Sequence, residues 1–151
     1  MAKIPRVLIV EDDEIIANLI TLMLEKKGYT IVGKSASGEE SIRKAAELEP
    51  DLILMDINLN GQMDGVTAAR YIFQLFYFPI IFLTALCDDN LLERAKSAQP
   101  YGYLLKPFTD LELTSHVERA LDNHRIKRSI RIHRPPQRRP PREEISLVNC
   151  S

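Results

Sequence analysis

Asp51-Leu52-Ile53-Leu54-Met55-Asp56 is the stretch of this chain that decides its fold. Four consecutive apolar residues separate two aspartates, and turn-forming residues flank the run, which is typical of a strand buried in a parallel sheet. Open α/β sheets bind their ligands at the carboxyl ends of the strands. We therefore expect Asp56 to face a site at the end of this strand.

A run nearer the start of the chain repeats this arrangement, because Val7-Leu8-Ile9-Val10 leads directly into Glu11-Asp12-Asp13. If the two strands are neighbours, three or four carboxylates meet in one small pocket. Like charges at this distance repel one another and raise each other's pKa, so the cluster predicts a divalent cation. Glu11 and Asp12 can hold Mg²⁺, which prefers oxygen ligands and keeps several of its waters.

Strand and helix patterns alternate five times along the chain, which predicts a parallel sheet with helices on both faces and right-handed crossovers. The expected strands cover residues 6–10, 30–34, 51–56, 79–84 and 101–105. The expected helices cover residues 14–27, 37–49, 65–76, 88 or 89–98, and 109 to at least 123.

Length and composition suit one compact domain with room for a tail, at 151 residues and 45% hydrophobic. Two cysteines are too few for a disulfide framework or a zinc site. No long apolar segment opens the chain, and the most apolar stretch, residues 71–87, is interrupted by polar residues and a proline. We therefore expect a soluble cytoplasmic protein without a membrane span.

Charge is distributed unevenly along the chain. Residues 1–124 hold 12 Lys and Arg against 19 Asp and Glu, a net charge of −7, whereas residues 125–151 hold 8 against 2, a net charge of +6. Residues 131–142 contain four prolines and five arginines, a composition that predicts neither a helix nor a core. We predict a folded domain over residues 4–126 and a basic, disordered tail over residues 127–151, with no recognisable output domain.

Four features that suit phosphoryl transfer stand at the carboxyl ends of the first, third, fourth and fifth expected strands: the pair Glu11 and Asp12, then Asp56, Thr84 and Lys106. Asp56 is a carboxylate nucleophile that can form an acyl phosphate. Thr84 offers a hydroxyl group after the fourth strand, and Lys106 offers a cation after the fifth. Pro107 follows Lys106, and an X-Pro bond can be cis and aim the lysine. Each feature is weak alone, and their convergence on one edge of the sheet gives the signal.

These motifs together resemble the receiver domain of two-component response regulators over about residues 4–125. The resemblance rests on five stretches in order: Val7-Leu8-Ile9-Val10-Glu11-Asp12-Asp13, Asp51-Leu52-Ile53-Leu54-Met55-Asp56, Met63-Asp64-Gly65, Ile80-Ile81-Phe82-Leu83-Thr84-Ala85 and Tyr103-Leu104-Leu105-Lys106-Pro107-Phe108. It implies a flavodoxin-like α/β fold, doubly wound, with five βα units and strand order 2-1-3-4-5. It also implies transfer of a phosphoryl group from a sensor histidine kinase to Asp56.

The same resemblance implies the roles of further residues. Asn58 would lend its backbone carbonyl to a metal site that also contains Glu11, Asp12 and Asp56. Ala85 would leave room for the phosphoryl group, and Tyr103 would turn inward when Thr84 moves toward the phosphate. The surface formed by residues 88–98, the strand 101–105 and the last helix would then signal to an unknown partner protein or form a homodimer.

Two regions depart from the expected pattern. The loop from Ile57 to Met63 is one residue longer than in many members of the family, although Asn60-Gly61 suits a tight turn. Phe76-Tyr77-Phe78 precede the fourth strand where polar residues are expected; they either pack under the sheet edge or form an exposed contact site. His116 and His124, on the last helix, have no carboxylate at ligand spacing, so we expect both at the surface.

Two function classes follow. The first is a signalling receiver, phosphorylated on Asp56, which is not an enzyme beyond its own phosphorylation and slow dephosphorylation. The alternative is receiver-controlled nucleic-acid binding through the basic tail, whose seven Lys and Arg between residues 127 and 142 could neutralise phosphates. The tail lacks aromatic stacking residues and a folded reader, which makes nucleic acid the weaker prediction. A flavodoxin-like enzyme acting on small phosphates is a third reading, and no substrate cleft supports it.

Overall fold

The computed structural model describes residues 3–85 and 89–132 and contains one five-stranded parallel sheet. The strand order is β2-β1-β3-β4-β5, as predicted. The strands are β1 (Arg6–Val10), β2 (Thr30–Ser35), β3 (Leu52–Asp56), β4 (Ile80–Thr84) and β5 (Gly102–Leu105). Because all pairs are parallel, every strand directs its carboxyl end to the same edge of the sheet.

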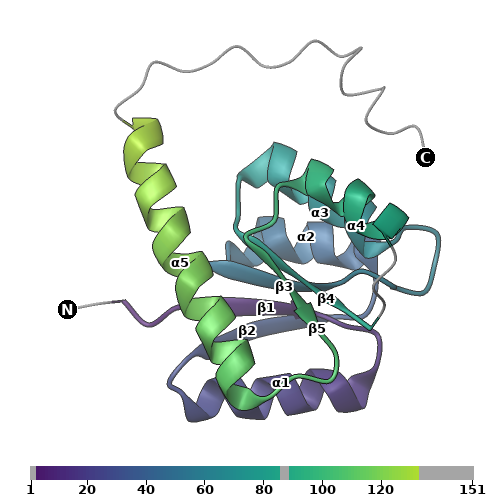
Figure 1. Cartoon of the computed structure of the whole chain (residues 1–151), viewed down its shortest axis with the longest axis horizontal. Coiled ribbons are helices and arrows are strands. Elements are labelled where there is room, and N and C mark those ends of the chain that lie inside the picture. Colours follow the sequence, from purple (N-terminus) through teal and green to yellow (C-terminus); the bar gives the residue numbers. More distant parts are fainter. Residues whose placement is uncertain (1–2, 86–88, 133–151) are drawn as a thin grey trace.

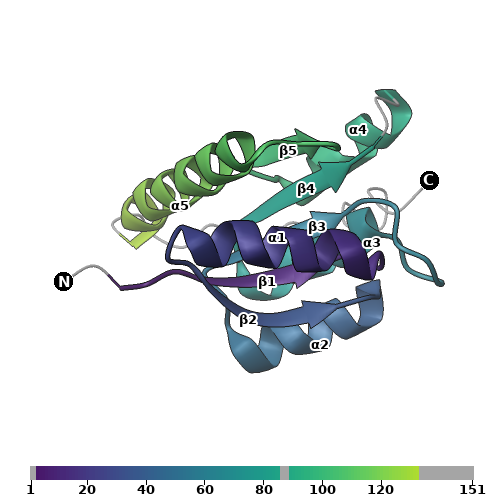
Figure 2. The same cartoon turned by 90° about the horizontal axis from the view of Figure 1, so that it is seen from below.

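Helices cover both faces of the sheet, with α2, α3 and α4 on one side and α1 and α5 on the other (Figures 1 and 2). The elements are α1 (Glu14–Lys26), α2 (Gly38–Leu48), α3 (Gly65–Phe76), α4 (Asp89–Ala95), the 3₁₀ turn η1 (Lys96–Ala98) and α5 (Asp110–Ile132). Side-chain oxygens of Asp13, Ser37 and Asp64 cap α1, α2 and α3. These caps satisfy backbone N–H groups that a helix leaves unpaired at its start.

The two faces of the sheet form two apolar layers, and the central strand β3 supplies both. Ile53 and Met55 point into the layer beneath α2, α3 and α4, whereas Leu52 and Leu54 point into the layer beneath α1 and α5. All four side chains are fully buried. The alternation follows from the two-residue period of a strand, and it gives β3 the unbroken apolar sequence that predicted it.

Gly65 fixes the start of α3 against the end of β3. A Cβ atom at this position would lie 1.9 Å from the carbonyl oxygen of Asp56, a distance that no side chain can tolerate. The N–H group of Gly65 donates to the carbonyl oxygen of Ile57 at 3.0 Å. The backbone of Asp56 and Ile57 therefore packs directly against the start of α3.

Aromatic residues before β4 belong to the core, in agreement with the first of the two alternatives. Phe76 and Phe78 are partly buried and pack against the layer beneath α2, α3 and α4. Their rings stack with 5.5 Å between centroids. Tyr77 ends α3 in the left-handed conformation, with φ of 58°, and is also partly buried.

His124 corrects the prediction of a surface position. Its ring is half-buried, its Nδ1 atom lies 3.1 Å from the hydroxyl oxygen of Tyr101, and it also packs against Tyr77. Burial lowers the pKa of His124, and the nearby positive charges of Arg128 and Lys127 lower it further. The spacing from Leu113, Val117 and Ala120 places His124 on the buried face of α5, so the helical period carried this signal.

The last helix corrects the predicted boundary between domain and tail. α5 continues to Ile132, so residues 127–132 of the predicted tail are helical. The side chains from Arg125 to Ile130 are all exposed. The remainder of the predicted tail, residues 133–151, lies outside the described residues. Within the part of the chain that the structure describes, none of the helices is both long enough and apolar enough to cross a membrane.

The packing at Gly65 makes a stability prediction. Gly65→Ala should lower the free energy of unfolding by about 3 kcal/mol or more, because the new methyl group collides with backbone atoms that cannot move aside. Urea denaturation of the purified protein measures this change. Gly102→Ala is the matched control, because its Cβ would lie 3.4 Å from the His116 ring, an ordinary contact. Equal stability of the two variants would contradict the packing described here.

Candidate functional site: an acidic pocket at the carboxyl edge of the sheet

Three carboxylates meet where β1 and β3 end. Asp56 is the last residue of β3, and Glu11 and Asp12 follow β1, which pairs with β3 so that Val10 lies opposite Met55. One carboxylate oxygen from each of the three residues lies within 4.8 Å of the other two. Glu11 and Asp56 are each only 4% exposed. Parallel neighbouring strands thus bring negative charge together in a site with little access to water.

Lys106 brings the compensating positive charge from the end of β5. Its Nζ atom lies 2.5 Å from Oε1 of Glu11 and 3.4 Å from Oδ2 of Asp56. The Lys106–Pro107 peptide bond is cis. The N–H group of Lys106 also donates to the carbonyl oxygen of Thr84 at 2.8 Å, which ties the backbone of the lysine to the end of β4.

The contact with Lys106 does not hold the pKa of Glu11 at its ordinary value. Burial, together with the hydrogen bond to Asp56 and its charge, raises the pKa of Glu11 from 4.5 to about 7, although Lys106 and the N–H group of Asp13 act in the opposite direction. Burial acts to lower the pKa of Lys106, but Glu11 and Asp56 outweigh it and the pKa is raised. At Glu11, burial and the carboxylate of Asp56 thus outweigh the effect of Lys106.

The loop between β3 and α3 contacts two of the carboxylates through its backbone. The N–H group of Asn58 donates to Oδ1 of Asp56 at 3.0 Å, and that of Asn60 donates to Oδ2 of Asp12 at 3.1 Å. The sequence predicted a role for the carbonyl group of Asn58, and that role stays a prediction. The contact of Asn60 was not predicted, because a backbone donor leaves no mark on residue type.

The predicted switch residues occupy the neighbouring strands. Thr84 ends β4, which pairs with β3, and it is fully buried. Ala85 follows it and is exposed. Tyr103 on β5 is half-buried and stacks on Phe82, with ring centroids 6.0 Å apart. Phe82 and Tyr103 are paired across β4 and β5, as are Thr84 and Leu105, so the two strands are in direct contact up to the end of β4.

The acidic pocket fits a divalent metal ion such as Mg²⁺. Its three side chains offer only carboxylate oxygens, the ligand type that Mg²⁺ prefers. Burial and the neighbouring carboxylate of Asp56 raise the pKa of Glu11, and a bound divalent cation would favour the charged form of Glu11. Glu11, Asp12 and Asp56 are the residues that would hold the ion.

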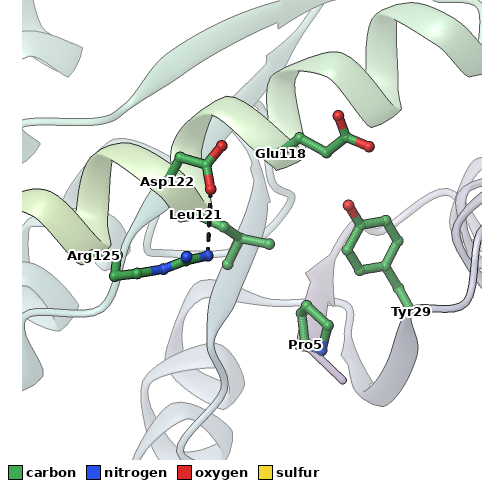
Figure 3. A pocket seen from close by; sticks show the side chains of 6 residues that line it. All are labelled: Pro5, Tyr29, Glu118, Leu121, Asp122 and Arg125. Carbon is green, nitrogen blue, oxygen red and sulfur yellow. Dashed lines mark hydrogen bonds and ion pairs between the residues drawn. The ribbon is translucent and has the colours of Figure 1, made fainter. Parts of the chain in front are cut away.

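A second concavity lies on the face covered by α5, away from the acidic pocket. This open groove of about 310 Å³ is lined by Pro5, Tyr29, Glu118, Leu121, Asp122 and Arg125 (Figure 3). Arg125 is bonded to Asp122 at 3.3 Å, and the remaining carboxylate of Glu118 would repel an anionic substrate. The groove therefore gives no support to an enzyme that acts on small phosphates.

Comparison with curated proteins places this site in a known context. The family described as response regulator receiver domain matches residues 7–118. The transcriptional regulatory protein PdtaR of Mycobacterium tuberculosis is 38% identical over 125 residues, which cover 82% of this chain and 60% of that protein. The probable C4-dicarboxylate response regulator DctR of Halalkalibacterium halodurans is 41% identical over 113 residues, covering 72% of this chain and 49% of that protein. The chain thus spans about half to three fifths of the length of these relatives.

Solved structures agree with this comparison. The signal receiver domain of a modulated diguanylate cyclase from Desulfovibrio desulfuricans has a TM-score of 0.79 at 38% identity, covering 83% of this chain and 99% of that one. The amino-terminal domain of a response regulator from Carboxydothermus hydrogenoformans has a TM-score of 0.75 at 39% identity, covering 81% and 98%. With its acidic pocket and its flavodoxin-like sheet, the chain belongs to the response regulator receiver domain family of two-component systems.

Proposed function

We propose that this chain is a phosphorylation switch in which Asp56 accepts a phosphoryl group from a phosphohistidine of a sensor histidine kinase. The observation that carries the proposal is the buried contact between Lys106 and two carboxylates, Glu11 and Asp56, at the carboxyl edge of the sheet. The chain then acts as a signalling protein, and its only reactions are its own phosphorylation and a slow dephosphorylation.

The chemistry follows from the placement of the side chains. An oxygen of Asp56 attacks the phosphorus, a P–O bond forms, and the P–N bond to the donor histidine breaks, leaving the imidazole to take up a proton. Lys106 already lies 3.4 Å from Asp56 and would pair with a phosphoryl oxygen, while the hydroxyl group of Thr84 would donate to another. Mg²⁺, held by Glu11, Asp12, Asp56 and the carbonyl group of Asn58, would neutralise charge on the transferred group.

An exposed apolar stripe on α1 supports an encounter with a kinase beside this pocket. Ile15, Leu19 and Leu22 are 79%, 48% and 66% exposed, and their spacing places them on one face of the helix. α1 begins two residues after Asp12. A partner that covers this stripe would bring its phosphohistidine to the mouth of the pocket.

The output proposal concerns α4, β5 and α5. When the phosphoryl group draws Thr84 inward, Tyr103 has room to bury more of its ring, and the surface formed by these elements changes. Leu105 and Leu111 on this surface are 49% and 74% exposed, which suits contact with a downstream protein or with a second copy of the chain. Signalling through this surface requires two packings of one fold.

Exposed basic residues at the end of α5 favour nucleic-acid binding as a second candidate function. Arg125, Lys127 and Arg128 extend the basic composition of residues 133–151 onto the described helix, whereas the body of the domain is acidic. Binding of duplex DNA should weaken steeply with salt if this candidate is correct. DNA binding by the full chain should be compared with binding by a chain that ends at residue 132, because an earlier truncation removes turns of α5.

Phosphorylation by a small donor tests the first function directly. After incubation with acetyl phosphate and Mg²⁺, intact-protein mass spectrometry should show the wild type gaining one phosphoryl group. Asp56→Asn should gain none, since an amide does not form an acyl phosphate. Asp12→Asn should lose most of the phosphorylation, because it loses a ligand of the metal. Asp122→Asn, in the distant groove, is the matched control and should react normally. Full phosphorylation of Asp56→Asn would exclude Asp56 as the acceptor.

The raised pKa of Glu11 predicts how stability depends on pH and Mg²⁺. Without metal, the folded protein keeps a proton on Glu11 that the unfolded chain loses above pH 4.5, so the free energy of unfolding should fall as pH rises from 4.5 to about 7. Mg²⁺ binds the charged form, so it should stabilise the protein more at pH 7.5 than at pH 5.

Denaturant titrations in EDTA and in Mg²⁺ measure both effects. Glu11→Gln should flatten the pH dependence between pH 4.5 and 7 relative to wild type and reduce the stabilisation by Mg²⁺. The difference between the two proteins isolates Glu11 from other carboxyl groups. An identical pH profile for both would show that Glu11 ionises as it does in the unfolded chain.

A further inference from the structure

The start of α3 is joined to α4 by an ion pair that none of the roles above uses. Nη2 of Arg94 on α4 lies 3.2 Å from Oδ2 of Asp64, which precedes α3. The other oxygen, Oδ1, accepts a hydrogen bond from the N–H group of Thr67 at 2.9 Å and so caps α3. One carboxylate thus serves two elements.

Asp64 is negatively charged at neutral pH, because its pKa is lowered. Burial acts to raise its pKa, but the hydrogen bonds from Thr67 and the guanidinium of Arg94 outweigh it and lower the pKa. Both side chains of the pair are about one third exposed, at 36% for Arg94 and 34% for Asp64. The contact is therefore weak enough to break and re-form within the folded protein.

The loop that ends at Asp64 begins in the acidic pocket. Residues 57–64 are bonded to Asp56 through Asn58 and to Asp12 through Asn60, at 3.0 Å and 3.1 Å. The far end of the same short loop is fixed by Gly65, which contacts the backbone of Asp56. A continuous line of contacts thus runs from the carboxylates of the pocket through the loop to Arg94.

We propose that Arg94 is a positioning residue of the acidic pocket, and that its contact with Asp64 couples binding of a divalent cation to α4. The inference rests on the proposed function, since it requires a cation held by Glu11, Asp12 and Asp56. It provides a route to α4 separate from the movement of Thr84 and Tyr103, because it passes through the loop between β3 and α3. A cation alone, without a phosphoryl group, engages this route.

Thermodynamic linkage requires the coupling between cation binding and the contact of Asp64 with Arg94 to act in both directions. If cation binding strengthens the contact between Asp64 and Arg94, then that contact must strengthen cation binding by the same factor, so loss of Arg94 should raise the Kd for the cation. A partly exposed ion pair supports a change of about two- to fivefold in affinity, not an all-or-none effect.

Mg²⁺ titration of the full chain, followed by NMR, tests the proposal. Amide shifts of residues 89–95 should respond to Mg²⁺ in the wild type, and amide hydrogen exchange there should slow. In Arg94→Gln this response of α4 should be lost while shifts at residues 11, 12 and 56 still titrate, with a Kd for Mg²⁺ about two- to fivefold higher.

Matched variants separate the ion pair from helix stability. Asp64→Asn keeps the cap of α3, because asparagine caps helices as well as aspartate does, and should reproduce the effect of Arg94→Gln. Arg94→Lys keeps the charge and should restore part of the response. Lys96→Gln breaks the exposed contact of Lys96 with Glu93, 3.0 Å long, and should leave the response intact.

The outcomes distinguish the inference from the function on which it rests. A wild type that binds Mg²⁺ and accepts a phosphoryl group, with an α4 response unchanged in Arg94→Gln, would overturn the coupling and leave the phosphorylation switch standing. A wild type whose residues 11, 12 and 56 ignore Mg²⁺ would overturn both. If Lys96→Gln lost the Mg²⁺ response of α4 as fully as Arg94→Gln does, the loss would result from general destabilisation of α4. That outcome would also reject the role of Arg94.

Discussion

Two carboxylates and one lysine, buried together at the end of the sheet, are the constraint on which this structure depends. Glu11 and Asp56 are almost inaccessible to water, and Lys106 reaches both. A buried charge without a partner is strongly unfavourable, so the three strands that carry these groups must keep their relative positions. Burial and the carboxylate of Asp56 raise the pKa of Glu11, and both carboxylates raise the pKa of Lys106.

The apolar layers supply the rigidity that this charge cluster requires. The parallel register of β1, β3, β4 and β5 sets where their last residues stand, and fully buried side chains on both faces of β3 fix that register. The proposed switch requires loops and half-buried residues at the edge of the sheet to rearrange while the sheet itself stays fixed. Tyr103 stacks on Phe82 at 6.0 Å and remains half-buried, which suits a residue with two alternative packings.

Much of this arrangement could be predicted because it depends on short sequence patterns, such as apolar runs that end on acidic residues. Apolar runs that end on acids predict β1 and β3, and both strands are present. The side chains of Glu11, Asp12, Asp56 and Lys106 meet as the strand ends indicated. Strand order came from the family resemblance and agrees with the structure.

Other features could not be predicted, for identifiable physical reasons. The contact between Asp64 and Arg94 joins residues 30 positions apart, and residue types alone do not select that pair. The start of the tail lies later than the predicted residue 127, because arginine is a good helix former and the first proline of this region is Pro135, so α5 continues to Ile132. The half-buried position of His124 differs from the expected surface position because the apolar face of α5 extends from Leu113 through Val117 and Ala120 to His124.

NMR with Mg²⁺ and beryllofluoride, which mimics a phosphoryl group on aspartate, measures whether charge added at Asp56 changes the packing of distant elements. The account predicts shift changes at Asp56, Thr84 and Lys106 and also at Tyr103 and along α4, residues 89–95. Asp56→Asn should show none of these changes on addition of beryllofluoride. Shift changes confined to residues that touch the ligand would contradict the account, because the pocket would then bind without switching the surface.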